Sequence, residues 1–190
     1  MIFPLFSKPV FITHIEFDKE KIVKETKNIN FEKINTSDYK PTASWISDSL
    51  KILNKPIFEE LKKPILEKFN EYVYDFLKYN NYKFRIKNSW LTKTNFLEKS
   101  ETHNHRDSCF SGVLYLQTEK MKGDISFFDL SKNGQIFKPS ENTIFNSEIW
   151  TFNLNENNLI FFPSEMHHKI DINKTHTERL SLAMDFETCD

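Results

Sequence analysis

Four of the six histidines in this chain fall in two short clusters. The first reads Thr102-His103-Asn104-His105-Arg106-Asp107, and the second reads Met166-His167-His168-Lys169. In an extended segment, residues two apart point to the same side, so His103 with His105, or His105 with Asp107, can converge on one point. A histidine from another strand can complete a three-ligand set. Such ligands, with open positions beside them, favour a divalent transition metal, and iron(II) is the leading metal.

Two ligand sets are therefore open. One is His103, His105 and His168, with Asp107 outside the shell, where it could orient an imidazole. The other is His105, Asp107 and His168, which would supply an anionic ligand. In both sets the side chain of His167, next to His168, is expected to point away from the metal.

A second candidate feature is an arginine that opens an alternating strand. Arg179, Ser181 and Ala183 share one face of Arg179-Leu180-Ser181-Leu182-Ala183, whereas the leucines and the following Met184 and Phe186 form the other. This pattern places a guanidinium among positions that line an interior. A buried guanidinium requires a fixed anion.

The elements that must position these residues are mostly strands. One strand is expected around residues 10–15 and a short helix around 19–29. An apolar stripe predicts a helix from Asn54 to about residue 77, with Asn54 as its cap, Pro56 near the first turn and Pro64 kinking or dividing it. After residue 81 the apolar period is two, which predicts strands at 82–86, 89–96, 111–117, 125–128, 144–145, 149–154, 159–162, 168–172 and 179–186.

This order predicts one domain over residues 1–190, in which 1–80 form a strand plus helical support and 81–190 form the β core. The expected class is mainly β (α+β), a sandwich or double-sheet jelly roll. Three glycines are too few for a dinucleotide-binding turn or a P-loop. The formal net charge of -1 gives no overall attraction to nucleic acid or an acidic membrane. Two distant cysteines and the absence of a long apolar run suggest a reduced, soluble, cytoplasmic protein.

Together these segments resemble the 2-oxoglutarate and Fe(II)-dependent oxygenases, whose signature is H-x-(H or D), then H, then R-x-S about ten residues later. More narrowly, the chain is similar to a small 2OG-Fe(II) oxygenase family of bacteria and marine phages. The similarity rests on Ser89-Trp90, His103-Asn104-His105, Ser111-Gly112-Val113-Leu114-Tyr115-Leu116, Phe162-Pro163-Ser164, His168 and Arg179-Leu180-Ser181-Leu182. Weaker matches are the Phe3-Pro4-Leu5-Phe6 opening and Ser44-Trp45-Ile46-Ser47.

The resemblance implies a distorted double-stranded β-helix (jelly roll, cupin-like) that binds Fe(II) and 2-oxoglutarate, uses O2 as co-substrate and is supported by ascorbate as a reductant. The spacing from Trp90 favours His103, His105 and His168 as ligands. The distal carboxylate of 2-oxoglutarate would pair with Arg179 and Ser181, and Tyr115 is a candidate further donor. A phage-encoded member would act in the host cytoplasm.

The function expected from this reading is a dioxygenase, a hydroxylase of a peptide or small molecule whose identity the sequence does not give. The oligomeric state is equally open. Two alternatives remain: a cupin-like metalloprotein that does not use 2-oxoglutarate, and a non-catalytic β-barrel binding module. In the first alternative Arg179 would pair with an internal Asp or Glu, and in the second the histidine clusters would face solvent.

Overall fold

The computed structural model describes residues 7–34, 44–120, 122–132 and 139–189, apart from the side chains of residues 123 and 132. Its strands are β1 (Phe11–His14), β2 (Phe31–Lys33), β3 (Trp45–Ser47), β4 (Lys83–Thr94), β5 (Phe110–Gln117), β6 (Gly123–Phe128), β7 (Ile149–Leu154), β8 (Asn158–Pro163), β9 (His167–Ile170) and β10 (Arg179–Cys189). Its helices are α1 (Lys19–Thr26) and α2 (Pro56–Asn70), with a π-helical turn (Glu71–Phe76) after α2 and 3-10 turns at Ile52–Asn54 and Leu130–Lys132.

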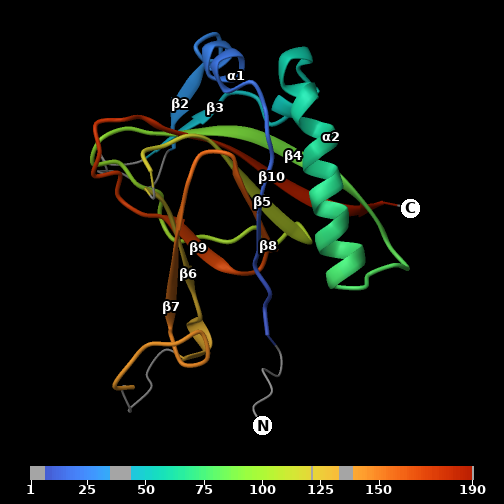
Figure 1. Cartoon of the computed structure of the whole chain (residues 1–190), viewed down its shortest axis with the longest axis vertical. Helices are drawn as coiled ribbons and strands as arrows, with labels where there is room; N and C mark the ends of the chain where they lie inside the picture. The colour runs from blue at the N-terminus through green and yellow to red at the C-terminus, as the bar shows by residue number, and fades with distance from the viewer. Residues whose placement is uncertain (1–6, 35–43, 121, 133–138, 190) are drawn as a thin grey trace.

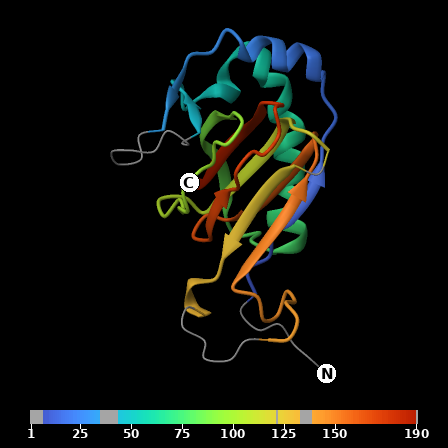
Figure 2. The ribbon, with the colours of Figure 1, turned by 90° about the vertical axis from the view of Figure 1, so that its left-hand side faces the viewer.

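The strands form two sheets that face each other (Figure 1). The larger sheet has seven strands in the order β1-β8-β5-β10-β4-β3-β2, and the smaller has three in the order β7-β6-β9. All strand pairs within the sheets are antiparallel. In Figure 2 the smaller sheet stands in front of the larger one, with α2 behind. The arrangement is a jelly roll, which confirms the predicted mainly β class with N-terminal supporting helices.

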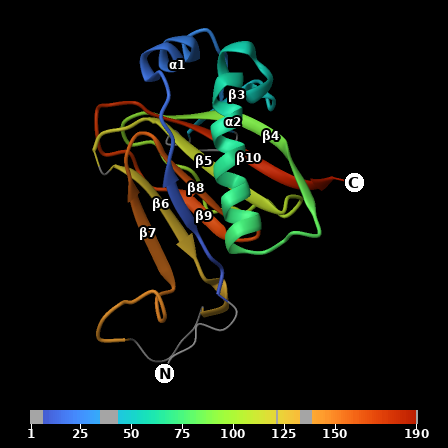
Figure 3. The ribbon, with the colours of Figure 1, turned by 45° about the vertical axis from the view of Figure 1, so that its right-hand side comes forward.

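Helix α2 covers the outer face of the larger sheet (Figure 3). Its apolar stripe, Phe58, Leu61, Ile65 and Phe69, is fully buried. The ring of Phe69 stacks on Phe186 of β10, with centroids 3.7 Å apart. This packing explains why a sequence with Pro64 in its interior still forms one continuous helix, because tertiary burial outweighs the lost amide donor.

The inner faces of the two sheets enclose a second apolar cluster: Val113, Tyr115, Ile125, Phe127, Leu154, Ile160, Phe162 and Ala183. Strand β10 contributes to both cores, since its even-numbered apolar residues belong to the outer core while Ala183 belongs to the inner one. The alternation predicted for this strand therefore separates the two layers. Arg179, Ser181, Ala183 and Asp185 share the inner face, and all four are buried.

Several local predictions were wrong. Of the two effects predicted for Pro64, a kink or a division, the division does not occur, because α2 runs unbroken from Pro56 to Asn70. Lys55 rather than Asn54 is its N-cap, because Asn54 lies in the preceding 3-10 turn. The two strands predicted at 82–86 and 89–96 are one strand, β4, over Lys83–Thr94. Ile144 and Phe145 form no strand but lie in a turn where both side chains are exposed. The sequence pattern also missed β2 and β3, which extend the larger sheet.

The opening Phe3-Pro4-Leu5-Phe6, used above for the resemblance, lies outside the described residues. Within the described ranges, no helix is both long enough and apolar enough to cross a membrane.

Candidate metal centre and anion site

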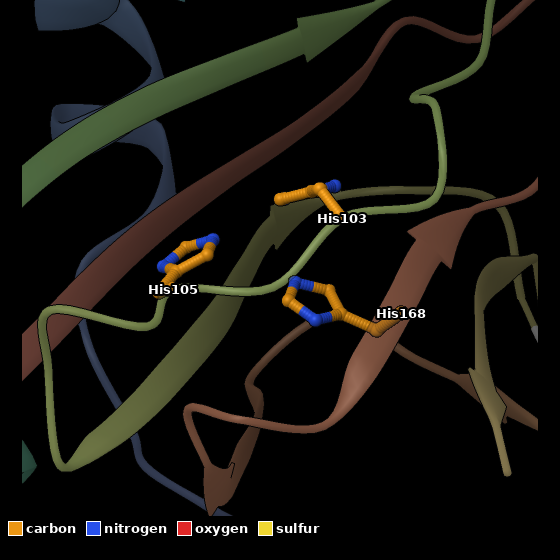
Figure 4. Close-up of side chains that lie close together, drawn as sticks. All are labelled: His103, His105 and His168. Atoms are coloured by element: carbon orange, nitrogen blue, oxygen red, sulfur yellow. The ribbon is translucent and has the colours of Figure 1, made fainter. Parts of the chain in front are cut away.

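The two histidine clusters come together between the sheets (Figure 4). His103 and His105 lie on the loop before β5, and His168 lies on β9. One nitrogen from each ring lies within 4.8 Å of one from each of the others, a spacing that could hold a metal ion. The adjacent His167 is not part of this group. Segments more than 60 residues apart in the sequence are thus placed around one point.

Backbone hydrogen bonds hold the histidine loop in place. The amide of His103 donates to the carbonyl of His168 at 2.9 Å, and the amide of His168 donates back to the carbonyl of His103 at 2.8 Å. This is an isolated antiparallel bridge between the loop and β9. The amide of His105 donates to the carbonyl of Ser164, in the turn after β8, at 2.9 Å. Main-chain hydrogen bonds therefore fix the positions of the three histidines relative to one another.

Each imidazole in the group also has its Nδ1 atom against an oxygen acceptor. His103 Nδ1 lies 2.8 Å from the carbonyl oxygen of Glu101, and His168 Nδ1 lies 3.0 Å from that of Met166. His105 Nδ1 lies 2.6 Å from Oδ1 of Asp185. Because carbonyl and carboxylate oxygens only accept, Nδ1 carries the hydrogen in each ring and the Nε2 lone pair is left for a metal.

The electrostatics of the group favour neutral imidazoles. Burial lowers the pKa of His168 to about 3, and the neighbouring His103 adds to that effect. Desolvation by the surrounding protein also lowers the pKa of His103, although this residue is the most exposed of the three. At neutral pH both rings are unprotonated, which is the form that binds a metal.

Asp107 lies outside this group. Its carboxylate accepts a hydrogen bond from Lys87 Nζ at 2.8 Å, and its side chain is 77% exposed. The Lys87 ammonium also lowers the pKa of this carboxyl group. Lys87 is the extra residue of a β-bulge in β4, because Asp185 pairs with Asn88 and Phe186 pairs with Ile86. The bulge therefore directs the lysine to Asp107 and away from β10.

The acid that does approach the histidines is Asp185, which the sequence analysis missed. Its Oδ1 accepts from Ser111 Oγ at 2.7 Å as well as lying against His105, and Ser111 Oγ lies 2.8 Å from Ser164 Oγ. The alternation on β10 contained the signal. Extending the face of Arg179, Ser181 and Ala183 by two residues reaches Asp185.

A cavity of about 550 Å³ opens over the three histidines. Its lining on the large-sheet side includes Ser111, Val113, Ser181 and Ala183. Toward the β2 edge of the same sheet, the segments around β2 and β3 add Glu32, Ile34, Ser44 and Ile46 to the lining. The unpredicted β2 and β3 thus build a large part of the wall.

The predicted anion-binding residues lie side by side on adjacent strands. Ser181 on β10 pairs with Tyr115 on β5, and Arg179 is next along the same face of β10. Ser181 lines the cavity, whereas Arg179 and Tyr115 lie beyond its lining. The guanidinium donates to the carbonyl oxygens of Asp171 at 2.6 Å and Lys122 at 3.2 Å.

These two residues leave polar atoms unsatisfied. Arg179 Nε and the Tyr115 hydroxyl are buried and have no hydrogen-bond partner among the described residues. No described carboxylate forms an ion pair with Arg179. Burial lowers the pKa of Arg179, an effect that Tyr115 and the carboxylates of Asp124 and Asp171 oppose. Burial raises the pKa of Tyr115, so its phenol is a neutral donor. Two buried donors without acceptors fit an anion that the protein itself does not supply.

Comparison with known families decides the class of protein. Residues 88–185, which contain all the histidines of the group and Arg179, match the family model described as "Putative 2OG-Fe(II) oxygenase". The chain belongs to this family. The predicted recognition is thus confirmed, together with its Fe(II) and 2-oxoglutarate cofactors.

Solved structures of 2OG-Fe(II) oxygenases share the fold. HygX from Streptomyces hygroscopicus, with nickel and 2-oxoglutarate bound, is 11% identical with a TM-score of 0.64, covering 95% of this chain and 83% of HygX. A Pseudomonas putida prolyl-4-hydroxylase is 14% identical with a TM-score of 0.61, covering 96% and 95%. The alpha-ketoglutarate-dependent epimerase SnoN, from nogalamycin biosynthesis, is 11% identical with a TM-score of 0.68, covering 95% and 78%. A search of curated proteins gives no significant match.

The residues of this oxygenase fit both cofactors. Three imidazoles with their Nδ1 atoms engaged present a nitrogen set suited to Fe(II). The unsatisfied donors of Arg179 and Tyr115 suit the distal carboxylate of a small diacid.

Proposed function

We propose that this oxygenase is a hydroxylase with a dioxygenase reaction, whose iron is held by His103, His105 and His168 through Nε2. The observation that carries this assignment is the group itself, in which one nitrogen of each ring lies within 4.8 Å of the others while Nδ1 is engaged elsewhere. The alternative set with Asp107 is disfavoured because Lys87 holds that carboxylate.

Bound iron supplies the activation of O2: 2-oxoglutarate, O2 and a substrate C–H bond are converted to succinate, CO2 and the C–OH product. The protein's part is to fix the ligand geometry, to hold the co-substrate and to exclude water. The apolar inner core around Val113 and Phe162 reaches the cavity lining beside His168 and provides the dry wall.

We assign the distal carboxylate of 2-oxoglutarate to Arg179, Tyr115 and Ser181. The Nε of Arg179 and the Tyr115 hydroxyl would gain the acceptors they lack, and the Ser181 hydroxyl can add a third donor from the cavity lining. The two backbone carbonyls that accept from Arg179 keep its guanidinium in place before the anion arrives. This preorganisation reduces the entropy cost of binding.

The substrate would be a peptide or a small molecule that binds in the cavity of about 550 Å³, whose lining includes residues of the β2 and β3 segments. The name of the Pseudomonas putida neighbour is that of a prolyl hydroxylase, and HygX has also been solved with hygromycin B bound, so both classes occur on this fold. Because SnoN is an epimerase, the fold does not by itself determine the reaction.

The geometry disfavours both alternatives. A cupin-like protein that ignores 2-oxoglutarate would satisfy Arg179 with an internal acid, but its observed acceptors are backbone carbonyls of Asp171 and Lys122. A binding module without metal would leave its histidine clusters apart and toward solvent; here His103 is exposed, but His168 is 4% exposed and nitrogens of all three rings lie within 4.8 Å of one another.

The test is succinate formation by purified protein supplied with Fe(II), ascorbate and 2-oxoglutarate, together with anaerobic titration of Mn(II). We expect metal-dependent 2-oxoglutarate binding and slow succinate release, both lost in His168→Ala. The matched control is His167→Ala, which removes the adjacent histidine on the same strand and should leave both intact. Equal metal binding by wild type and His168→Ala would refute the ligand assignment.

A further inference from the structure

We propose that Asp185 is a positioning residue that gives the three-histidine iron site its anionic character through His105. The inference rests on the proposed ligand set and goes beyond it. Three neutral imidazoles bring no negative charge to the metal, unlike a set that includes a carboxylate. In this chain the nearby acid on the histidine loop, Asp107, is held by Lys87, whereas Asp185 lies against a ligand ring.

The three histidines differ in what engages them. His103 and His168 face backbone carbonyls, which are neutral acceptors. His105 alone faces a carboxylate, and its 2.6 Å contact with Asp185 is the shortest of the three Nδ1 contacts. A carboxylate behind a ligand imidazole fixes the ring orientation and makes it a stronger electron donor to the metal. One negative charge is therefore placed one ring away from the iron.

The groups around Asp185 fix the position of its carboxylate beside His105. Its side chain is 7% exposed, compared with 77% for Asp107. Ser111 donates to the same Oδ1 that meets His105, and Ser164 lies against Ser111, so a chain of hydroxyls from β5 and from the turn after β8 supports the acid. Ser164 also accepts the amide of His105 through its carbonyl. The network thus fixes the ligand and its charge partner together.

The backbone of β10 places Asp185 on the inner face of the larger sheet. The alternation of β10 runs unbroken from Arg179 to Asp185 and sets the acid on the inner face, while the register shift beside it comes from the extra residue Lys87 in β4. Bulges of this kind commonly re-aim side chains beside active sites. A carboxylate at a central strand position, buried on the inner face, has no evident use in packing.

The decisive experiment compares Asp185→Asn with Asp107→Asn in the full chain. Both variants lose one negative charge and keep the side-chain shape, but only one touches the histidine group. Anaerobic Fe(II) titration should show affinity about 10- to 100-fold weaker for Asp185→Asn and unchanged for Asp107→Asn. The Fe(III)/Fe(II) midpoint potential should rise in Asp185→Asn alone, because less negative charge remains to stabilise Fe(III).

The potential is the readout that a merely structural role would not move. Wild-type affinity and potential in Asp185→Asn would overturn the proposal. Loss of metal in Asp107→Asn instead would overturn it in favour of the other ligand set. If wild type binds no Fe(II), or His168→Ala binds it equally well, the proposed function fails, which is distinct from a failure confined to Asp185.

A second pair keeps the test open if Asp185→Asn does not fold. Asp185→Glu and Asp185→Gln are equal in length and shape and differ in charge alone. We expect the Glu variant to bind Fe(II) more tightly and to have the lower potential. Equal affinity and potential in the two variants would overturn the proposal.

Discussion

Replacing Tyr115 by Phe should make the cofactor-free protein more stable and the cofactor-bound protein less so. The Tyr115 hydroxyl is fully buried and has no described hydrogen-bond partner. An unpaired buried hydroxyl costs about 1–3 kcal/mol in protein substitution data, and Phe removes that cost while keeping the ring. The free energy of unfolding should therefore rise by up to about that amount, or roughly 2–4 °C in melting temperature per kcal/mol for a chain of this size.

With 2-oxoglutarate present the sign reverses, because Phe cannot donate to the distal carboxylate. A hydrogen bond to a charged group contributes about 1.5–3 kcal/mol, which corresponds to a loss of roughly ten- to a hundred-fold in 2-oxoglutarate affinity. Urea unfolding of the metal-free protein and calorimetric titration of 2-oxoglutarate into the Mn(II)-loaded protein measure the two effects separately.

Tyr72→Phe is the matched control. Tyr72 is also buried, but its hydroxyl donates to the carbonyl of Pro9 at 2.8 Å in the outer core. It should therefore lose about 1 kcal/mol of stability and keep its 2-oxoglutarate affinity. If Tyr115→Phe is destabilised like Tyr72→Phe and binds 2-oxoglutarate normally, the assignment of an unsatisfied donor to the co-substrate is wrong.

Three further outcomes follow from the same contacts. Gly112→Ala should lose about 1–3 kcal/mol of stability, because a Cβ there would lie 2.7 Å from the Phe161 ring; urea unfolding at wild-type level would show that the ring moves aside freely. His168 has a pKa of about 3 in the folded protein, compared with 6.5 in the unfolded chain, so only the unfolded chain takes up a proton there between these two pH values. The free energy of unfolding of the metal-free protein should therefore fall by a few kcal/mol as the pH is lowered from about 6.5 toward 3. In His168→Gln the free energy of unfolding should fall less steeply as the pH is lowered. The same pH dependence in this variant and in wild type would contradict the prediction. Mn(II) should raise the melting temperature of wild type but not of His168→Ala, and stripping it with a chelator should reverse the gain.

The sequence predicts those parts of the site in which the functional residues lie two positions apart in the chain. His103 and His105 are two residues apart, as are Arg179 and Ser181, so a period of two places each pair on one side whatever the partner strands are. The same rule, carried one step further along β10, would have reached Asp185. That omission reflects a pattern ended too early at Ala183 rather than missing information.

The part that could not be predicted depends on pairing between distant segments. The polar region before residue 44 and the short segment after it carry little alternation, yet β2 and β3 form there, join the edge of the larger sheet and line the cavity. Conversely, Ile144 and Phe145 have the residue types of a strand but lie in a turn. Whether a short apolar pair becomes a strand is decided by the sheet beside it, because strand propensity is mostly a matter of context.

Strand β10 carries residues of both the proposed anion site and the histidine group. Its pairing is irregular at two places: opposite β5 between Leu180 and Ser181, and opposite β4 between Asp185 and Phe186. The regular segment between these two shifts carries Ser181 at the anion end and Asp185 at the metal end, on one face. Strand β10 is paired on one side with β4 and on the other with β5, so a displacement at Asp185 is transmitted to Ser181. We therefore expect that deletion of Lys87, which removes the bulge in β4, weakens the binding of both Fe(II) and 2-oxoglutarate. Loss of one without the other, in paired titrations, would show that the two ends are positioned independently.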